Sequence, residues 1–199
     1  MNPAMNSPST THGPRLPLIG EPSEPETVAM FEEVKTRTGR LLNLHRVMGY
    51  APRLAKASME MALQLRTGTL LPRPMIELMI LRTAQTVGSD YEWQQHHPMA
   101  LAIGMSEKQI DAIERWPDSD LFSEKERAAL GLCDSVIAKQ QLDDAAFQRL
   151  RQHFSPREIV EITVVVCEYL ATAHFVRALG VPLEAARIQS AGIVETPKR

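Results

Sequence analysis

The sequence predicts an all-α protein with one helical domain, and three observations carry that prediction. Apolar residues recur every three or four positions through most of the chain, as they do on one face of a helix. No segment shows the sustained apolar–polar alternation of a half-buried strand, and the β-branched run ITVVV at 162–166 lies inside a longer helical pattern. Short polar connections join the periodic segments, which is typical of a helical bundle.

Start and stop signals divide the chain into elements. Residues 1–25 are rich in Pro, Ser, Thr and Gly and predict an irregular arm, for which one expected place is the surface of a neighbouring subunit. Residues 26–190 form the expected single domain, and 191–199 form a C-terminal tail. The expected helices cover 27–38, 43–48, 52–67, 74–88, 91–104, 107–116, 124–140, 145–154 and 157–179.

Prolines and capping residues set several of these boundaries. Pro52 and Pro74 suit the first turn of a helix, where their missing N–H costs nothing. Ser106 and Ser123 are each followed three residues later by Gln or Glu, the pattern of a capping box. Pro98 lies inside 91–104, so we expect either a kink near His97–Pro98 or a helix that begins at Pro98.

Composition limits the possible partners. The 199 residues are 44% hydrophobic, which permits a buried core, and their net charge of −2 gives no general attraction for nucleic acid or a membrane surface. No run of eighteen apolar residues predicts a membrane-spanning helix. The first residues lack the basic and apolar regions of a signal peptide. We therefore expect a cytoplasmic protein with no nucleic-acid and no membrane partner.

The two cysteines, Cys133 and Cys167, are far apart and each lies in an apolar run. Two cysteines cannot form a disulfide framework. Free cysteine is among the most frequently buried residue types, so we interpret both as packing residues rather than reactive thiols.

The residues most able to carry chemistry lie between Glu77 and Gly104. Glu92 and His96 are four residues apart and share one face of a helix, where a carboxylate beside an imidazole makes a proton-transfer pair. Small residues, Ala100 and Gly104, continue that face. Glu77 stands in an otherwise apolar helix, where a carboxylate needs partners or a raised pKa.

Each of these features has a plainer interpretation that the sequence leaves open. Glu92 and His96 could form an exposed ion pair that contributes a few tenths of a kcal/mol. Glu77 could pair with Arg73 or Arg82 on a solvated face. Trp93 is the kind of residue that more often packs in a core than against a substrate.

A metal site is a weaker possibility. His96, His97 and the glutamates are ligand types, but the HExxH pattern is absent. Adjacent histidines on a helix also diverge by about 100°. We expect neither a metal nor another cofactor.

Two segments resemble each other weakly: LPRPMIELMILRTA, with Arg73 and Glu77, and FSPREIVEITVVVC, with Arg157 and Glu161. In each segment an Arg follows a helix-starting position and a Glu stands four residues later. The likeness suggests pseudo-repeated halves, although amphipathic helices that start with Pro often look alike.

Residues 73–106 resemble the core motif of the carboxymuconolactone decarboxylase and alkylhydroperoxidase D (AhpD) superfamily. That motif runs from a Glu in an apolar helix to Cys-x-x-Cys, a His, a small residue and Gly-Leu-Ser. Glu77, His96, Ala100 and the Gly104 turn match it, at the same intervals. The flanking segments 41–61 and 158–184 also look like the family, so the resemblance covers most of 28–185. It implies an AhpD-like multi-helix bundle that assembles as a trimer or hexamer, with a dimer as an alternative.

The sequence departs from the motif where the peroxidase branch carries its thiols. Ser89 and Glu92 occupy the two cysteine positions, and neither side chain can reduce a peroxide. Glu92, Trp93 and His96 instead match the Glu-aromatic-x-x-His of the decarboxylase branch. His174 stands where related sequences often carry Arg. A positive charge that would hold a substrate carboxylate is therefore present there only when His174 is protonated.

The resemblance and the residues together predict a cofactor-free acid–base enzyme of lyase type, acting on a small organic acid or lactone. His96, Glu92 and Glu77 are the expected catalytic residues. The candidate substrate contacts are Trp93, Tyr91, Ser89 and His174. Two alternatives stay open: an AhpD-like peroxidase with an antioxidant role, and a non-catalytic or metal-binding helical module.

Overall fold

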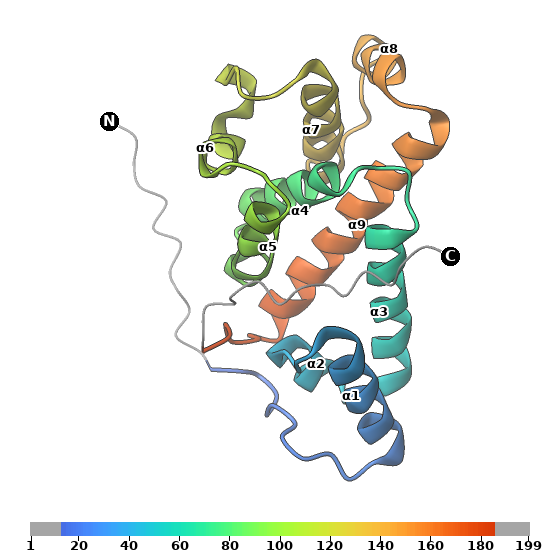
Figure 1. Ribbon diagram of the computed structural model, residues 1–199, viewed down its shortest axis with the longest axis vertical. Helices are drawn as coiled ribbons and strands as arrows, with labels where there is room; N and C mark the ends of the chain where they lie inside the picture. Colours follow the sequence, from blue (N-terminus) through green and yellow to red (C-terminus); the bar gives the residue numbers. More distant parts are fainter. Residues whose placement is uncertain (1–12, 186–199) are drawn as a thin grey trace.

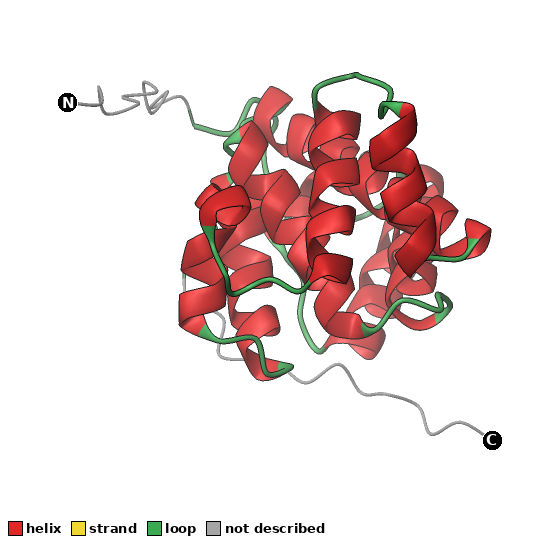
Figure 2. Cartoon of the chain, turned by 90° about the horizontal axis from the view of Figure 1, so that it is seen from above, coloured by secondary structure: helices red, strands yellow, loops and turns green. Residues whose placement is uncertain are grey.

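The computed structural model describes residues 13–185, and within that range the chain forms nine α-helices, one 3-10 helix and no strand (Figure 2). The all-helical prediction is confirmed. In chain order the elements are α1 (Pro25–Thr38), α2 (Asn43–Met48), α3 (Pro52–Thr67), α4 (Arg73–Val87), α5 (Asp90–Ala102), α6 (Glu107–Ala112), η1 (Ile113–Asp118), α7 (Glu124–Ile137), α8 (Asp144–His153) and α9 (Pro156–Ala178).

Two helices differ from their sequence predictions. The segment expected as one helix over 107–116 divides into α6 and the 3-10 helix η1, with non-helical backbone at Arg115. Pro117 has no N–H, so it cannot serve the Ile113 carbonyl four residues before it. The helix expected over 124–140 ends at Ile137.

The helix that carries Glu92 and His96 runs unbroken from Asp90 to Ala102, with Pro98 inside it. The expectation that a helix begins at Pro98 is therefore wrong. The alternative expectation, a kink inside a continuous helix, agrees with this continuous helix. Ser89 is the N-cap of this helix, because its hydroxyl accepts from the Glu92 backbone N–H at 3.4 Å. This cap fixes the first turn, where Glu92 lies.

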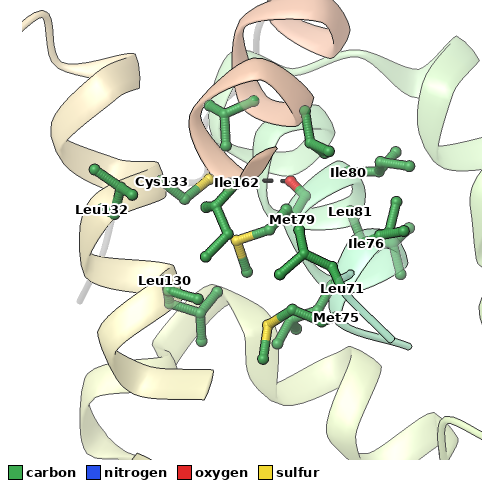
Figure 3. Packing of buried hydrophobic residues seen from close by; sticks show 14 of the residues in the cluster. Leu71, Met75, Ile76, Met79, Ile80, Leu81, Leu130, Leu132, Cys133 and Ile162 are labelled. Atoms are coloured by element: carbon green, nitrogen blue, oxygen red, sulfur yellow. Dashed lines mark hydrogen bonds between the residues drawn. The ribbon is translucent and has the colours of Figure 1, made fainter. Parts of the chain in front are cut away.

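Helices α4, α5 and α9 occupy the middle of the molecule, with α1–α3 at one end and α6–α8 at the other (Figure 1). Helix α4 packs against α5, α7 and α9 and is buried almost all round. The main core lies where α4, α7 and α9 meet, and its members include Met79, Leu130, Cys133 and Ile162 (Figure 3).

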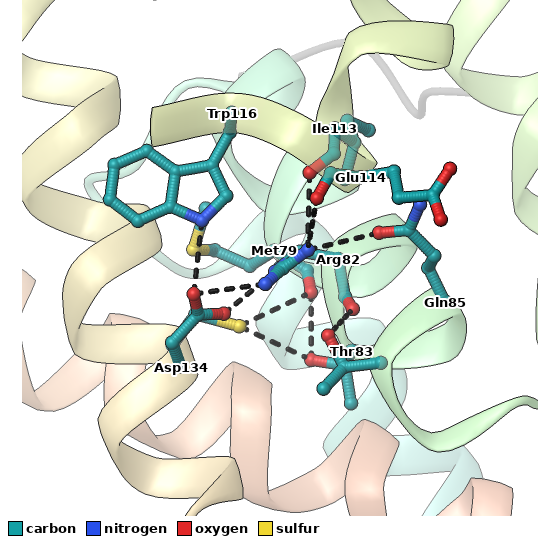
Figure 4. A network of polar contacts seen from close by, with 10 residues as sticks. Met79, Arg82, Thr83, Gln85, Ile113, Glu114, Trp116 and Asp134 are labelled. Carbon is teal, nitrogen blue, oxygen red and sulfur yellow. Dashed lines mark hydrogen bonds and ion pairs between the residues drawn. The ribbon is translucent and has the colours of Figure 1, made fainter. Parts of the chain in front are cut away.

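Arg82 anchors α4 to the α6–α8 end (Figure 4). Its guanidinium donates to both oxygens of Asp134 on α7, at 2.6 and 2.9 Å, and to the Ile113 carbonyl of η1 at 3.1 Å. The Trp116 indole N–H donates to Asp134 at 3.0 Å. Arg82 therefore donates to the Ile113 carbonyl the hydrogen bond that Pro117 cannot provide. Arg82 is not the partner of Glu77.

The described part of the N-terminal arm lies on its own chain. The Arg15 backbone N–H donates to the Leu179 carbonyl at 2.9 Å, and Arg46 of α2 donates to the Ile19 carbonyl at 2.8 Å. Contact of the arm with a neighbouring subunit is untested, and residues 1–12 and 186–199, which include the expected tail, lie outside the described residues.

Helix α9 is long and apolar enough to cross a membrane when judged by length and composition alone. The sequence expectation counted unbroken apolar runs and missed this helix. A core helix of a globular domain passes the same test, and α9 supplies Ile162, Val165 and Val166 to the main core. A cytoplasmic location stays a prediction.

Candidate active site

The link between α4 and α5 brings the predicted catalytic residues together. Gly88 ends α4 in the left-handed region, at φ 66°, which glycine adopts without strain. Ser89 follows as the cap of α5, so the chain reverses within two residues and α5 runs back along α4. As a result, Glu77 and His96, nineteen residues apart, come into contact.

The His96 imidazole lies between two carboxylates. Its Nδ1 is 2.7 Å from Glu77 Oε2, and its Nε2 is 3.6 Å from Glu92 Oε2. All three residues are buried, and Glu77 has no exposed surface. The alternative of an exposed Glu92–His96 pair is therefore wrong. The structure thus places one imidazole between two carboxylates, while the catalytic role of these residues stays a prediction.

Glu77 is held as a carboxylate. Burial alone would raise the pKa of Glu77, but the neighbouring His96, Arg73 and Arg66 outweigh that effect and lower it. Arg73 forms an ion pair with Glu77 Oε1, on the other side of the carboxylate from His96. The unusual position of a glutamate in an apolar helix is thus explained by partners on both of its oxygens.

The pKa of Glu92 is displaced in the opposite direction. Burial raises the pKa of Glu92, the nearby Glu77 adds to the rise, and His96 only partly opposes it. Its side chain is 3.6 Å from His96, too long for a hydrogen bond, so charge rather than a directed bond links the two groups. The pKa values of the two carboxyl groups are therefore displaced in opposite directions, that of Glu77 downwards and that of Glu92 upwards.

Tyr169 of α9 packs against the imidazole of His96. Its ring meets the His96 ring edge-on, with centroids 5.0 Å apart and planes at 89°. Burial raises the pKa of Tyr169 to about 12, although the Arg66 cation opposes the rise. The phenol therefore keeps its proton at neutral pH.

Sequence reasoning missed Arg66 and Tyr169, and it treated Arg73 only as one possible partner of Glu77. Arg66 lies in the last turn of α3, and its charge acts on Glu77, Tyr169 and His45. Burial, with Arg40 and Arg66, lowers the pKa of His45 to about 4, so this histidine stays neutral at neutral pH.

The four predicted substrate contacts have other positions or roles. Ser89 caps α5, and Tyr91 binds the chain at the C-terminal end of the domain, donating to Glu184 Oε1 at 2.8 Å. Trp93 packs against the main core. His174 is exposed on α9. Substrate binding by these four residues stays a prediction.

The second histidine of α5 and both cysteines also lie apart from this centre. His97 Nε2 is 3.1 Å from Glu107, and its ring faces Trp93 at 5.7 Å. Burial raises the pKa of the Cys133 thiol to about 12, whereas Cys167 is exposed. The prediction that both cysteines are buried is therefore wrong for Cys167. Within residues 13–185 no three His, Cys, Asp or Glu side chains group as metal ligands would.

Comparison with known proteins finds a family that is similar to part of this chain. Residues 52–134 match the sequence model of the Carboxymuconolactone decarboxylase family. This match spans less than half of the chain, and together with the AhpD-like solved structures described below it supports the carboxymuconolactone decarboxylase and AhpD superfamily. The match covers Arg66, Arg73, Glu77, Glu92 and His96, whereas Tyr169 lies outside it.

Two bacterial relatives share the same region. The chain is 26% identical over 92 residues to the uncharacterized protein YdfG of Bacillus subtilis and 32% identical over 87 residues to YnjA of Escherichia coli, also uncharacterized. These matches cover 45% and 43% of this chain. They span 63% and 47% of the two relatives, less than two thirds of each.

Solved structures share the fold over most of the chain. A protein of unknown function from Agrobacterium tumefaciens, described as an AhpD-type antioxidant defence protein, has a TM-score of 0.66 and 29% identity over 70% of this chain and 97% of its own. A peroxidase-related protein from Silicibacter has a TM-score of 0.74 at 18% identity, over 87% and 93% of the two chains. The debrominase Bmp8 has a TM-score of 0.68 at 20% identity, over 81% and 87%. The last two likenesses concern the fold alone.

Proposed function

We propose that the protein is a cofactor-free acid–base enzyme of lyase type that acts on a small organic acid or lactone. One observation carries the proposal: His96 lies buried between two carboxyl groups whose pKa values are displaced in opposite directions. Pairs of titratable groups pushed apart in this way are how enzymes obtain an acid and a base from similar side chains.

Glu77 would fix the imidazole. An ionised carboxylate can only accept a hydrogen bond, so His96 Nδ1 must carry the proton of the 2.7 Å contact. That contact sets the ring orientation and leaves Nε2 as the exchanging nitrogen. A base oriented by a third group in this manner is the usual arrangement in acid–base and nucleophilic sites.

Glu92 would supply the exchangeable proton. Decarboxylation breaks the bond to the departing carboxyl carbon, releases carbon dioxide and leaves the electron pair on the substrate. His96 Nε2 would donate a proton to the substrate carbon that keeps this electron pair, and Glu92 would return a proton to the ring and recover it from solvent. Proton transfer by a positioned side chain contributes typically 10²–10⁴-fold to rate.

The thiol-peroxidase alternative lacks its reacting groups in this site. The thiolate is the reactive form of cysteine, and the raised pKa of Cys133 keeps that thiol protonated. Replacing Cys133 and Cys167 together by Ala should leave native activity standing. Robust hydroperoxide reduction that disappears in this double variant would favour the peroxidase instead.

Turnover of a panel of small lactones and carboxylic acids tests the proposal. His96→Asn and Glu92→Gln should each lower turnover at least about a hundredfold while far-UV circular dichroism stays unchanged. His97→Asn is the matched control, because His97 is the adjacent residue and its partner is Glu107. Turnover that survives His96→Asn but not His97→Asn would show that the wrong histidine has been assigned.

A further inference from the structure

A small cleft lies between η1, α7 and α8, at the end of the molecule opposite to α1–α3 (Figure 1). Its volume is about 270 Å³, near the lower end of the roughly 300–1,000 Å³ that is typical of small-molecule pockets. Residues from all three helices and from the loop before α8 line it, among them Trp116, Arg127, Gly131, Leu142 and Arg149. This α7–α8 cleft shares no lining residue with the site proposed above, so it is a separate feature of the fold.

Gly131 keeps the floor of the cleft open. It lies in the interior of α7, where glycine lowers the stability of a helix relative to alanine. Its φ is not positive, and a Cβ at this position would meet no atom outside its own stretch of helix within 4 Å. Neither backbone conformation nor crowding therefore requires glycine here. A hollow that is kept free for a ligand accounts for the missing side chain.

Two walls of the cleft are held in place before any ligand binds. The Trp116 indole N–H donates to Asp134 at 3.0 Å, which fixes one end of the ring system (Figure 4). The Arg127 guanidinium donates to the Pro117 carbonyl at 3.1 Å and to the Ser119 carbonyl. Because these side chains are already ordered, a ligand that contacts them loses little affinity to the ordering of the site.

The apolar part of the lining suits a flat ring. Trp116, Leu142 and Ala146 provide apolar surface around the open floor at Gly131. Aromatic rings pack well against tryptophan in offset or edge-on arrangements, and guanidinium groups also stack on ring faces. The small volume leaves room for a single small ring system rather than an extended molecule.

The charged part of the lining favours an anion. Arg127 and Arg149 bring two positive charges to the cleft and Glu124 brings one negative charge, while His153 adds no negative charge. Asp134 is already paired with an arginine of α4. Arg149 is exposed, and no hydrogen bond or ion pair joins its guanidinium to another residue in 13–185. One positive charge is therefore left over, with donors available on Arg149.

We propose that the α7–α8 cleft is a second binding site of this protein and that it takes a small aromatic anion, a flat ring system that carries one negative charge. The ring lies over Gly131 beside Trp116, and the charged group meets Arg149 at the rim. This inference goes beyond the proposed acid–base function and does not depend on it, because the cleft contains none of the expected catalytic residues.

Isothermal titration at neutral pH tests the inference with three probes: benzenesulfonate, benzenesulfonamide and methanesulfonate. Benzenesulfonate should bind at millimolar concentration or below. Benzenesulfonamide, which lacks the charge, and methanesulfonate, which lacks the ring, should each bind at least about tenfold more weakly. Absence of benzenesulfonate binding, or equal binding of benzenesulfonate and either of the other probes, overturns the proposal.

Two variants with matched controls locate the binding. Gly131→Leu fills the floor and should weaken benzenesulfonate binding at least about tenfold, whereas Ala145→Leu adds the same side chain on the exposed surface of α8 and should leave it unchanged. Arg149→Gln should weaken binding to a similar extent, and Arg151→Gln, also exposed on α8, should not. Should Gly131→Leu fail to fold, the arginine pair still decides. Unchanged binding in folded Gly131→Leu or in Arg149→Gln contradicts the assignment.

NMR of the indole N–H groups gives an independent location. The chain has two tryptophans, Trp93 and Trp116, and the resonance that is lost in Trp93→Phe identifies each of them. Benzenesulfonate should shift the Trp116 resonance and leave that of Trp93, which lies beside His97, in place. The same shift should occur in His96→Asn, since the acid–base centre takes no part in this binding. A shift of Trp93 alone, or loss of binding in folded His96→Asn, would place the probe outside the cleft and overturn the proposal.

Discussion

The Glu77 carboxylate is the residue on which the site depends most, because it contacts His96 with one oxygen and Arg73 with the other. Glu77→Gln should lower the free energy of unfolding by about 3–5 kcal/mol, the usual cost of breaking a buried ion pair from one side. Urea unfolding at pH 7 measures the change. Glu32→Gln is the control, since its ion pair with Lys35 is largely exposed and should contribute at most about 1 kcal/mol.

The same variant has a defined dependence on pH. The pKa of Glu77 is lowered in the folded state, so its contribution is fully present above the ordinary glutamate value of 4.5 and is lost as pH falls through the folded-state pKa. The stability difference between the unaltered protein and Glu77→Gln should therefore shrink in acid. A difference that grows below that value would contradict the lowered pKa.

Glu92 should behave in the opposite way. Its pKa is raised in the folded state, so the stability contribution of its neutral form is present in acid and is lost as pH rises through the folded-state pKa. Glu92→Gln should thus be more stable than the unaltered protein at pH 8, by about 1 kcal/mol or roughly 2–4 °C in Tm, and about equal to it near pH 4. Scanning calorimetry at the two pH values measures this. A Glu92→Gln variant less stable than the unaltered protein at pH 8 would show that the ionised Glu92 does not destabilise the fold.

At the residue scale, the sequence could indicate the three groups that share local spacing or a family motif. Glu92 and His96 are one helical turn apart, and the motif interval points to Glu77. Arg66 and Tyr169 carried no such signal, because they lie on α3 and α9, and only tertiary packing brings those helices to His96. His174 was preferred for its position in the motif, but it falls on the exposed side of α9.

At the scale of elements, helix starts were predictable and some helix ends were not. Ser106, Ser123 and Ser155 cap their helices as local sequence requires. The division of 107–118 into α6 and η1 depends on tertiary contacts as well as on Pro117, since Arg82 binds the Ile113 carbonyl. The Arg-x-x-x-Glu echo appears as an ion pair in both helices, Arg73–Glu77 in α4 and Arg157–Glu161 in α9.

The segment after α9, residues 179–185, forms a strap that is hydrogen-bonded to α5, the helix that carries Glu92 and His96. Glu184 Oε1 accepts from the Tyr91 hydroxyl at 2.8 Å and from the Asn43 N–H at 2.7 Å, and the Glu184 N–H donates to Gln94 at 3.0 Å. Glu184→Ala should lower the free energy of unfolding by about 1–3 kcal/mol, because the buried Tyr91 hydroxyl loses its acceptor.

A double-mutant cycle checks that the strap acts through this contact. Tyr91→Phe removes the hydroxyl, so Glu184→Ala should cost less in the Tyr91→Phe background than in the unaltered protein. Additive effects of the two changes on urea unfolding would show that Glu184 and Tyr91 act independently.

At the scale of the whole molecule, the outer face of α9 is the feature that a single chain leaves unexplained. Only 33% of its most apolar stretch is buried, and Val160, Cys167 and Ala171 follow one another at helical spacing on the exposed side. Leu54 and Met61 of the adjacent α3 are exposed as well. Subunits commonly bury apolar faces of this kind against one another.

We therefore expect the homo-oligomer, trimer or hexamer before dimer, to assemble through this α3–α9 face. Ala171→Glu would place a charge in the middle of that interface, where burying it without a partner is costly. Sedimentation velocity at micromolar concentration should show the unaltered protein as an oligomer and the variant shifted towards the monomer. Gln148→Glu, an equal charge change on the exposed surface of α8, should keep the oligomer. A monomeric unaltered protein would exclude the assembly, and an intact Ala171→Glu oligomer would move the interface to another face.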